Sequence, residues 1–368
     1  MNSEKVALMR ARIEEQIAKI DNKDFTFYFY VPDTKGIASG SLSYLYDVAL
    51  GLQNMGYKVG MMYSEEDFVG VEEWLGKEYA ELPHHNVEKS SIDITPSDIL
   101  FIPEVYSNVM TATKKLPCQR VAILQSFDKL VEFIPFGATW ADLGITKAIT
   151  TTEANANRLR TYFPFVTTSV VNPKLSNIFT KPDGMKKLMV NIVTREPGDV
   201  NKIVKPFFWQ YPMYKWVAFR DLRGLPRDQF AQALQEAAIT VWVDDITNFG
   251  FTPLEAMKSG SIVLGKVPDV MPEWMMGDSE EADVLTNAGI WVDNIASIPS
   301  VLASVIRTWT MDEIPPEIQE TADVLVNKFT EGKHLQDIKT EIIDKLVVGR
   351  RSEYLTTLET LNNNLKEE

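Results

Sequence analysis

Residues 241–265 read Val-Trp-Val-Asp-Asp-Ile-Thr-Asn-Phe-Gly-Phe-Thr-Pro-Leu-Glu-Ala-Met-Lys-Ser-Gly-Ser-Ile-Val-Leu-Gly. This pattern predicts a buried strand, a polar loop, a short helix, a turn and a second strand. Gly250 lets a ligand approach the backbone, Pro253 suits the first position of the helix, and Gly260 is a typical helix terminator. The free N–H groups and positive dipole end of this helix are suited to an anion.

Glu255 lies one turn into the expected helix and could accept hydrogen bonds from neutral hydroxyl groups of a ligand. The same four residues, Thr252 to Glu255, also form a capping box, in which both side chains satisfy the helix's own N–H groups. The local pattern does not choose between capping and ligand binding.

Outward from this stretch, apolar strands alternate with amphipathic helices in two series, which predicts α/β architecture with two doubly wound parallel sheets. The first series has expected strands at 25–31, 57–63, 98–103, 120–125, 147–151 and 168–171, and a helix at 41–55. The second has expected strands at 188–193, 214–219, 239–243, 261–264 and 289–292, and helices at 201–209, 226–237, 253–259 and 296–309.

The expected organisation has four parts: an amphipathic helix (1–24), a first Rossmann-like domain (25–182), a second one (183–333) and terminal helices (334–368). The polar stretch 180–184 is typical of a hinge. We expect the first of the terminal helices to return to the first domain. The apolar seam formed by Tyr354, Leu358, Leu361 and Leu365 predicts local packing or a homodimer contact.

The amino-acid composition excludes several classes of function. The 368 residues carry a net charge of -14, which opposes general binding of nucleic acid or anionic lipid. The lone Cys118 and three histidines give neither a disulfide framework nor a zinc pattern. The charged first twenty residues do not resemble a signal peptide, and no apolar run is long enough to span a bilayer. We therefore expect a cytoplasmic protein.

The run 248–263 resembles the donor-site signature of retaining glycosyltransferases of family 4, which have the GT-B fold. A weaker likeness extends over about 25–348 and includes the loop Asp33 to Gly40, which is similar to the family's first glycine-rich loop. The sequence departs from the family at Thr247, where the family has its first glutamate.

The resemblance implies a nucleoside diphosphate sugar as donor, such as a UDP- or GDP-sugar, with no cofactor and no metal. Glu255 would hold the ribose hydroxyls, and Arg195 and Lys202 would neutralise the leaving diphosphate, with Lys205 an equal candidate for the second cation. The expected catalytic residues are Arg195, Lys202 and Thr247; the expected donor-binding residues are Gly36, Lys205, Asn248, Phe249, Gly250, Phe251, Thr252 and Glu255; Glu104, Tyr106 and Gln125 are candidate acceptor contacts.

Segment 181–230 holds ten basic and five acidic residues, against the acidic balance of the whole chain. This indicates either a diphosphate pocket or a groove for a phosphate-bearing acceptor, including DNA bases modified by phage-type glycosyltransferases. Aromatic residues gather at 207–219, where core packing is favoured over stacking on a base or sugar.

The leading hypothesis is a hexosyl- or pentosyltransferase that moves a sugar to an unidentified acceptor hydroxyl with retention. Retaining transfer with front-face departure needs no enzymic base, since the leaving phosphate takes the acceptor's proton. Thr247 leaves open a second hypothesis, a degenerate, non-catalytic nucleotide-sugar-binding module. A GT-B phosphorylase or epimerase is less favoured, because the sequence has no evident lysine signature for pyridoxal phosphate.

Overall fold

The computed structural model describes residues 3–245, 249–277 and 285–367 and divides into two compact units. The first unit contains residues 1–173 and 332–368, and the second contains 174–331. The chain therefore crosses between the units at 173/174 and again at 331/332, whereas the sequence suggested boundaries at 182/183 and 333/334. The polar stretch 180–184 belongs to the second unit.

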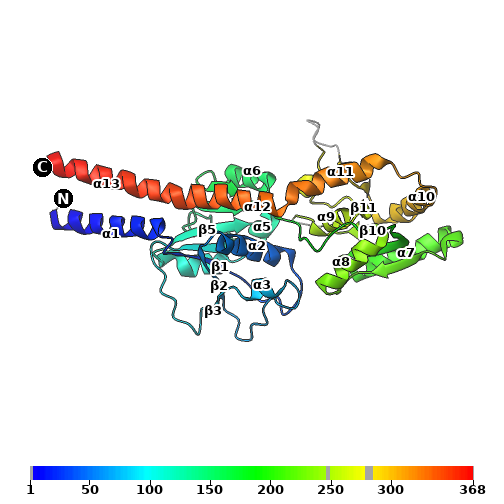
Figure 1. Ribbon diagram of the computed structural model, residues 1–368, viewed down its shortest axis with the longest axis horizontal. Coiled ribbons are helices and arrows are strands. Elements are labelled where there is room, and N and C mark those ends of the chain that lie inside the picture. Colours follow the sequence, from blue (N-terminus) through cyan, green and yellow to red (C-terminus); the bar gives the residue numbers. More distant parts are fainter. Residues whose placement is uncertain (1–2, 246–248, 278–284, 368) are drawn as a thin grey trace. The chain divides into compact units, whose positions relative to one another are not determined.

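The first unit is a parallel sheet of seven strands in the order β3-β2-β1-β4-β5-β6-β7, covered by helices (Figure 1). Its strands are β1 (Thr26–Tyr30), β2 (Lys58–Tyr63), β3 (His84–Asn86), β4 (Ile99–Pro103), β5 (Gln119–Leu124), β6 (Lys147–Thr150) and β7 (Thr167–Val170). Its helices are α1 (Ser3–Asp21), α2 (Gly40–Asn54), α3 (Lys77–Ala80), α4 (Ser107–Ala112), α5 (Phe127–Phe133), α6 (Glu153–Tyr162), α12 (Glu331–Asp337, which begins at the crossing), a π-helix (Ile338–Val348) and α13 (Gly349–Glu367).

The second unit has five parallel strands in the order β12-β11-β10-β8-β9. Its strands are β8 (Lys187–Thr194), β9 (Ala218–Asp221), β10 (Ala237–Val243), β11 (Ile262–Lys266) and β12 (Ile290–Val292). Its helices are α7 (Pro197–Gln210), α8 (Arg227–Glu236), α9 (Phe251–Lys258), α10 (Ile298–Thr310) and α11 (Pro316–Val326). The predicted α/β fold class is confirmed.

The strands predicted from the sequence differ from the structure at two places. The strand expected at 214–219 lies at β9, because Tyr214 ends a short 3-10 turn instead of entering the sheet. The edge strand β3 was missed because its three residues, which include two histidines, have no apolar alternation.

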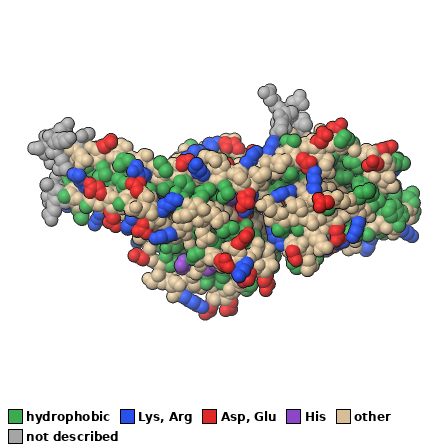
Figure 2. Space-filling model, in the orientation of Figure 1, with side chains coloured by type: hydrophobic (Ala, Val, Ile, Leu, Met, Phe, Trp, Pro, Cys, Tyr) green, Lys and Arg blue, Asp and Glu red, His purple; other side chains and the backbone are tan. Residues whose placement is uncertain are grey.

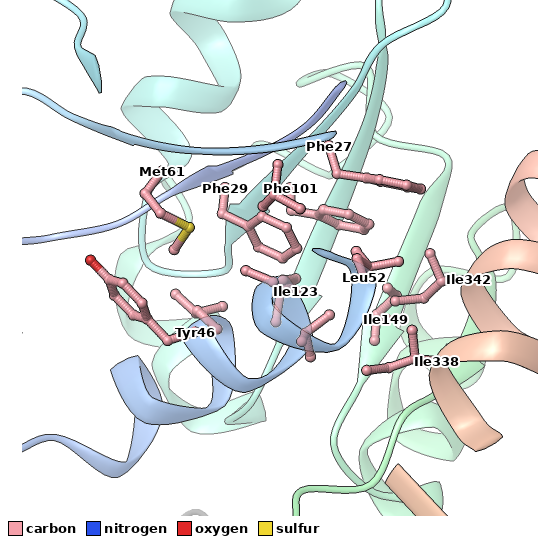
Figure 3. Close-up of a cluster of buried hydrophobic side chains, with 14 of the residues drawn as sticks. Phe27, Phe29, Tyr46, Leu52, Met61, Phe101, Ile123, Ile149, Ile338 and Ile342 are labelled. Atoms are coloured by element: carbon pink, nitrogen blue, oxygen red, sulfur yellow. The ribbon is translucent and has the colours of Figure 1, made fainter. Parts of the chain in front are cut away.

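Segments far apart in sequence build the first unit's core. Figure 3 shows Ile338 and Ile342 of the π-helix pointing toward Leu52 of α2 and Ile149 of β6, and all four side chains are fully buried. A Cβ added at Gly51 would lie 2.5 Å from Ile338 Cδ1, so a larger residue there would force the Ile338 side chain to shift where α2 and the π-helix meet. The residues after 331 are thus a structural part of the first unit.

The two terminal helices pack against each other. Val6 and Ile13 of α1 and Leu361 of α13 form a small buried cluster, with Tyr354 and Leu358 partly buried beside it. The apolar seam of the last helix therefore faces α1 of the same chain, as the local-packing interpretation expects.

Candidate functional site

The carboxylate of Glu255 is the best-defined feature of the second unit's candidate site. Glu255 lies in the first turns of α9 and is 5% exposed. Its Oε1 is 3.5 Å from Nη2 of Arg227, the first residue of α8, and the Arg227 guanidinium lies 5.3 Å from the centre of the Phe179 ring. Burial raises the pKa of Glu255, while the charges of Arg227 and Lys258 act to lower it. Within the part of the chain that the structure describes, this long ion pair is the one salt bridge of the carboxylate, which leaves it able to accept further hydrogen bonds.

The start of α9 differs from the predicted capping box. The N-cap is Gly250, in the left-handed conformation (φ +73°), and no side chain caps the helix, so Thr252 is its second residue and Pro253 its third. The capping-box interpretation and the placement of Pro253 at the first helical position are wrong, because the left-handed glycine turns the chain into the helix two residues earlier. The first N–H groups of α9 have no partner within the helix, and no side chain of the described residues caps them.

Trp274 closes one side of this turn. Its indole Nε1 donates a hydrogen bond of 2.5 Å to the carbonyl oxygen of Phe249, and a Cβ added at Gly250 would lie 3.2 Å from Trp274 Cζ2. The positive φ favours glycine at position 250, and the close approach of Trp274 leaves little room for a Cβ. The rings of Phe249 and Phe329 pack edge to face within the core, with their centroids 5.0 Å apart. Because its side chain is buried, Phe249 could contact a sugar donor only through its backbone.

The end of α9 is as predicted. Gly260 follows the last turn with φ +74°, its N–H donates to the carbonyl of Met257, and the N–H of Ser261 donates to that of Ala256. These two bonds are a Schellman motif, which confirms Gly260 as the terminator.

The proposed diphosphate cations lie near the carboxyl end of β8, and both are paired with acids. Arg195 follows β8 directly and forms a two-pronged ion pair with Asp244, with Nε–Oδ1 and Nη2–Oδ2 distances of 2.9 Å. Lys202 on α7 lies 2.7 Å from Asp199, and this carboxylate raises the pKa of the lysine. Lys205, one turn further along α7, is exposed. A diphosphate bound here would compete with Asp244 for the Arg195 guanidinium.

Other expected donor contacts lie around α9 or outside the described residues. Thr247 and Asn248 fall outside the described residues. Phe251 opens α9 and is partly exposed, as is Thr252.

In the first unit, the acceptor candidates lie at the carboxyl ends of neighbouring strands. Glu104 follows β4, is 4% exposed, and accepts a 2.9 Å hydrogen bond from the N–H of Ser126. Burial raises its pKa to about 7, which is suited to proton exchange near neutral pH. Gln125 is buried and donates to the carbonyl of Ser41, and Tyr106 packs edge to face against Tyr30 at 4.9 Å.

Gly36 lies in the loop after β1. Its φ is +79°, and nothing lies within 4 Å of an added Cβ, so its surroundings are open. Asp33 organises this loop by accepting hydrogen bonds from the N–H groups of Lys35 and Val69.

Arg227 is the site residue to which the sequence analysis gave no role. It was counted only as one of the basic residues of 181–230. A cation in the first turn of a helix opposes the helix dipole, and that mismatch could have indicated an acidic partner. Glu255 is that partner.

The aromatic cluster at 207–219 is only partly core. Phe207 is fully buried, as expected, but Trp209 and Trp216 are 76% and 61% exposed. The visible face in Figure 2 shows Lys and Arg interspersed with Asp and Glu, without the large basic area that a nucleic-acid surface would need.

No helix among the described residues is long and apolar enough to cross a bilayer. Within the same residues, no three His, Cys, Asp or Glu side chains come together as metal ligands would.

Solved structures with a similar fold are glycosyltransferases. A glycosyltransferase from Rickettsia africae ESF-5 aligns with a TM-score of 0.58 at 13% identity, over 88% of this chain and 98% of that one. The lipopolysaccharide outer core galactosyltransferase WaaB, in its apo form, gives 0.55 at 11% identity, over 87% and 100%. This chain has the GT-B fold.

The structure of a plant enzyme aligns with this chain to a similar extent. The catalytic domain of starch synthase IV from Arabidopsis thaliana, bound to ADP and acarbose, gives a TM-score of 0.55 at 10% identity, over 89% of this chain and 99% of that one. No protein-family model matches the sequence. A search of curated proteins also found no match.

Proposed function

We propose that this protein is a glycosyltransferase that moves a sugar from a nucleoside diphosphate to an acceptor hydroxyl, with retention and without a metal. The observation that carries the proposal is the buried Glu255 carboxylate near the start of a helix that no side chain caps among the described residues. The likeness to glycosyltransferase structures supports the same reaction class.

Each feature has a role in the reaction. Glu255 accepts hydrogen bonds from the ribose hydroxyls of the donor. The first N–H groups of α9 and the guanidinium of Arg195 stabilise negative charge on the departing diphosphate, and they follow the neighbouring strands β10 and β8. The departing phosphate removes the proton of the acceptor hydroxyl on the same face of the sugar, so the configuration at the anomeric carbon is retained.

The central experiment replaces Glu255 with Gln. Glu255→Gln keeps the side-chain volume but loses the charge, so we expect at least tenfold weaker binding of UDP-glucose or GDP-mannose in calorimetry. Glu317→Gln, an exposed glutamate on α11, is the matched control and should bind as the unmodified protein does. Circular dichroism checks that both variants are folded. If the two folded variants bind the nucleotide sugar equally well, Glu255 does not hold the donor.

The second candidate is a non-catalytic nucleotide-sugar-binding module. It is favoured by the ion pairs that already engage Arg195 and Lys202, and by the lack of a charge at Thr247. Incubation with a panel of nucleotide sugars separates the two functions. A transferase releases nucleoside diphosphate slowly by transfer to water, whereas a binding module releases none.

A further inference from the structure

A second site candidate lies in the first unit, at the edge of the sheet away from the acceptor candidates. A cavity of about 390 Å³ opens beside the amino ends of β5 and β6 and the start of α13. Its polar and charged lining includes Lys114, Gln119, Arg120, Lys147, Arg350 and Glu353. Its volume is in the range of small-molecule sites. None of these residues belongs to the candidate glycosyltransferase site.

The cavity is basic in a chain of net charge -14. Four basic residues line it, and Glu353 is the acidic residue of the lining. Among the described residues, none of the four basic side chains has a carboxylate within ion-pair distance. Lys114 donates to the carbonyl of Asp142, and Arg120 to the carbonyls of Met110, Leu143 and Gly144.

Arg350 adds a buried cation whose hydrogen bonding is incomplete. It is 6% exposed, and its Nη atoms donate to the carbonyls of residues 96–98. Its Nε is buried and has no hydrogen-bond partner among the described residues. The carboxylates of the buried Asp98 and of Glu353 act electrostatically on the guanidinium, so its positive charge is partly balanced.

Gln119 supplies a second unsatisfied group. Both its Nε2 and Oε1 atoms are buried, and neither has a hydrogen-bond partner in the described part of the chain. Unpartnered buried polar groups destabilise a fold, so native structures rarely retain them without a ligand, water or functional reason. The residues that line this cavity thus include a guanidinium and an amide with buried, unpartnered atoms, together with cations that have no carboxylate within ion-pair distance among the described residues.

We propose that this cavity binds a small phosphate monoester. A phosphate dianion matches the positive charge of the Arg350 guanidinium and the Lys147 ammonium, and its oxygens can accept hydrogen bonds from such cations. The Gln119 amide, which can both donate and accept, suits a hydroxyl-bearing ester group. The site lies at the amino ends of the strands, so its occupation does not depend on the proposed transferase function.

The binding test uses the full chain with glucose 6-phosphate as probe. We expect saturable binding in calorimetry and a rise in melting temperature, both weakened by added NaCl, with no response to glucose. A response to sulfate equal to that of the ester would overturn the monoester assignment. Sedimentation with phosphatidic acid vesicles, without a response to glucose 6-phosphate, would assign the site to a lipid headgroup and overturn the small-molecule proposal.

Two variants locate the site. Lys147→Gln should weaken glucose 6-phosphate binding about tenfold, and the matched Lys115→Gln, an exposed lysine outside the cavity lining, should not. Gln119→Leu should also weaken binding while leaving the melting temperature of the free protein unchanged or higher, because no hydrogen bond is lost. Unchanged affinity in both cavity variants would overturn the proposal.

Discussion

At the scale of single residues, charge pairing decides what each candidate group can do. Glu255 and Arg227 are 28 positions apart and meet at 3.5 Å in a mostly buried setting. Arg195 and Lys202 instead lie at exposed positions, each against an aspartate. Exposed ion pairs contribute little stability, so a ligand can displace them at small cost. The two cations proposed for the donor site are therefore available to a ligand, although paired.

Freeing Arg195 should strengthen diphosphate binding. Asp244→Asn removes the competing charge, and because an exposed pair is worth up to about 1 kcal/mol, we expect roughly two- to fivefold tighter binding of UDP. Titration calorimetry measures it. Asp221→Asn, which breaks the Asp221–Arg223 pair of the same unit, should leave the affinity unchanged. Weaker binding by Asp244→Asn would mean that Asp244 positions the guanidinium instead.

Glu104 should make the first unit less stable as pH rises. Its pKa is raised in the folded state to about 7, so the unfolded chain gives up the proton first, and stability falls between about pH 4.5 and 7. The full effect is about 3 kcal/mol. Glu104→Gln should remove this loss and be more stable than the unmodified protein at pH 8. Urea unfolding at pH 5 and pH 8 tests it, with the exposed Glu72→Gln as control.

At the scale of elements, glycines set both ends of α9. Gly250 begins the helix and Gly260 ends it, both in left-handed backbone conformations. The first exposes N–H groups and the second satisfies the final carbonyls through the Schellman bonds. The helix is therefore completed at its carboxyl end and left open to a ligand at its amino end.

Substitution at Gly260 tests the helix end. Gly260→Ala should cost about 1 kcal/mol or more, because alanine disfavours positive φ, while the nearest atoms to the new Cβ are flexible side-chain carbons of Lys181 and Lys186. Gly198→Ala, in the first turn of α7 with open space around its Cβ, should be neutral or stabilising. Thermal unfolding compares them. Equal effects would contradict the backbone argument.

At the scale of the whole molecule, the first unit is discontinuous in sequence. Its core includes four fully or almost fully buried side chains from the π-helix, Ile338, Ile342, Leu346 and Val347. Burial of each contributes about 1.5–3 kcal/mol, and the sum is comparable to the whole stability of a domain. The second unit is one continuous segment with its own core clusters.

Removal of residues 332–368 should therefore unfold the first unit selectively. We expect scanning calorimetry of the truncated chain to retain the transition of the second unit and to lose that of the first. As a milder change, Ile338→Ala should destabilise the first unit by about 2–5 kcal/mol. The nearby Val348→Ala, at a position 46% exposed, should have little effect. Loss of both transitions on truncation would contradict the division.

The sequence by itself determined the α/β class, nearly all the strands, and Gly260 as the helix terminator. These features follow from periodicity and turn chemistry within a dozen neighbouring residues. It also singled out Glu255, through a local pattern that had two interpretations. Its predictions were weakest where the local signal was short or ambiguous, as at β3 and at the start of α9.

Only the tertiary structure decided which distant groups meet. It paired Glu255 with Arg227 and Arg195 with Asp244. It brought Arg350 and Gln119 into the lining of the same basic cavity. It also joined the last helices to the first core. Local patterns cannot predict such meetings, because each depends on strand order and on packing between segments that chain periodicity does not relate.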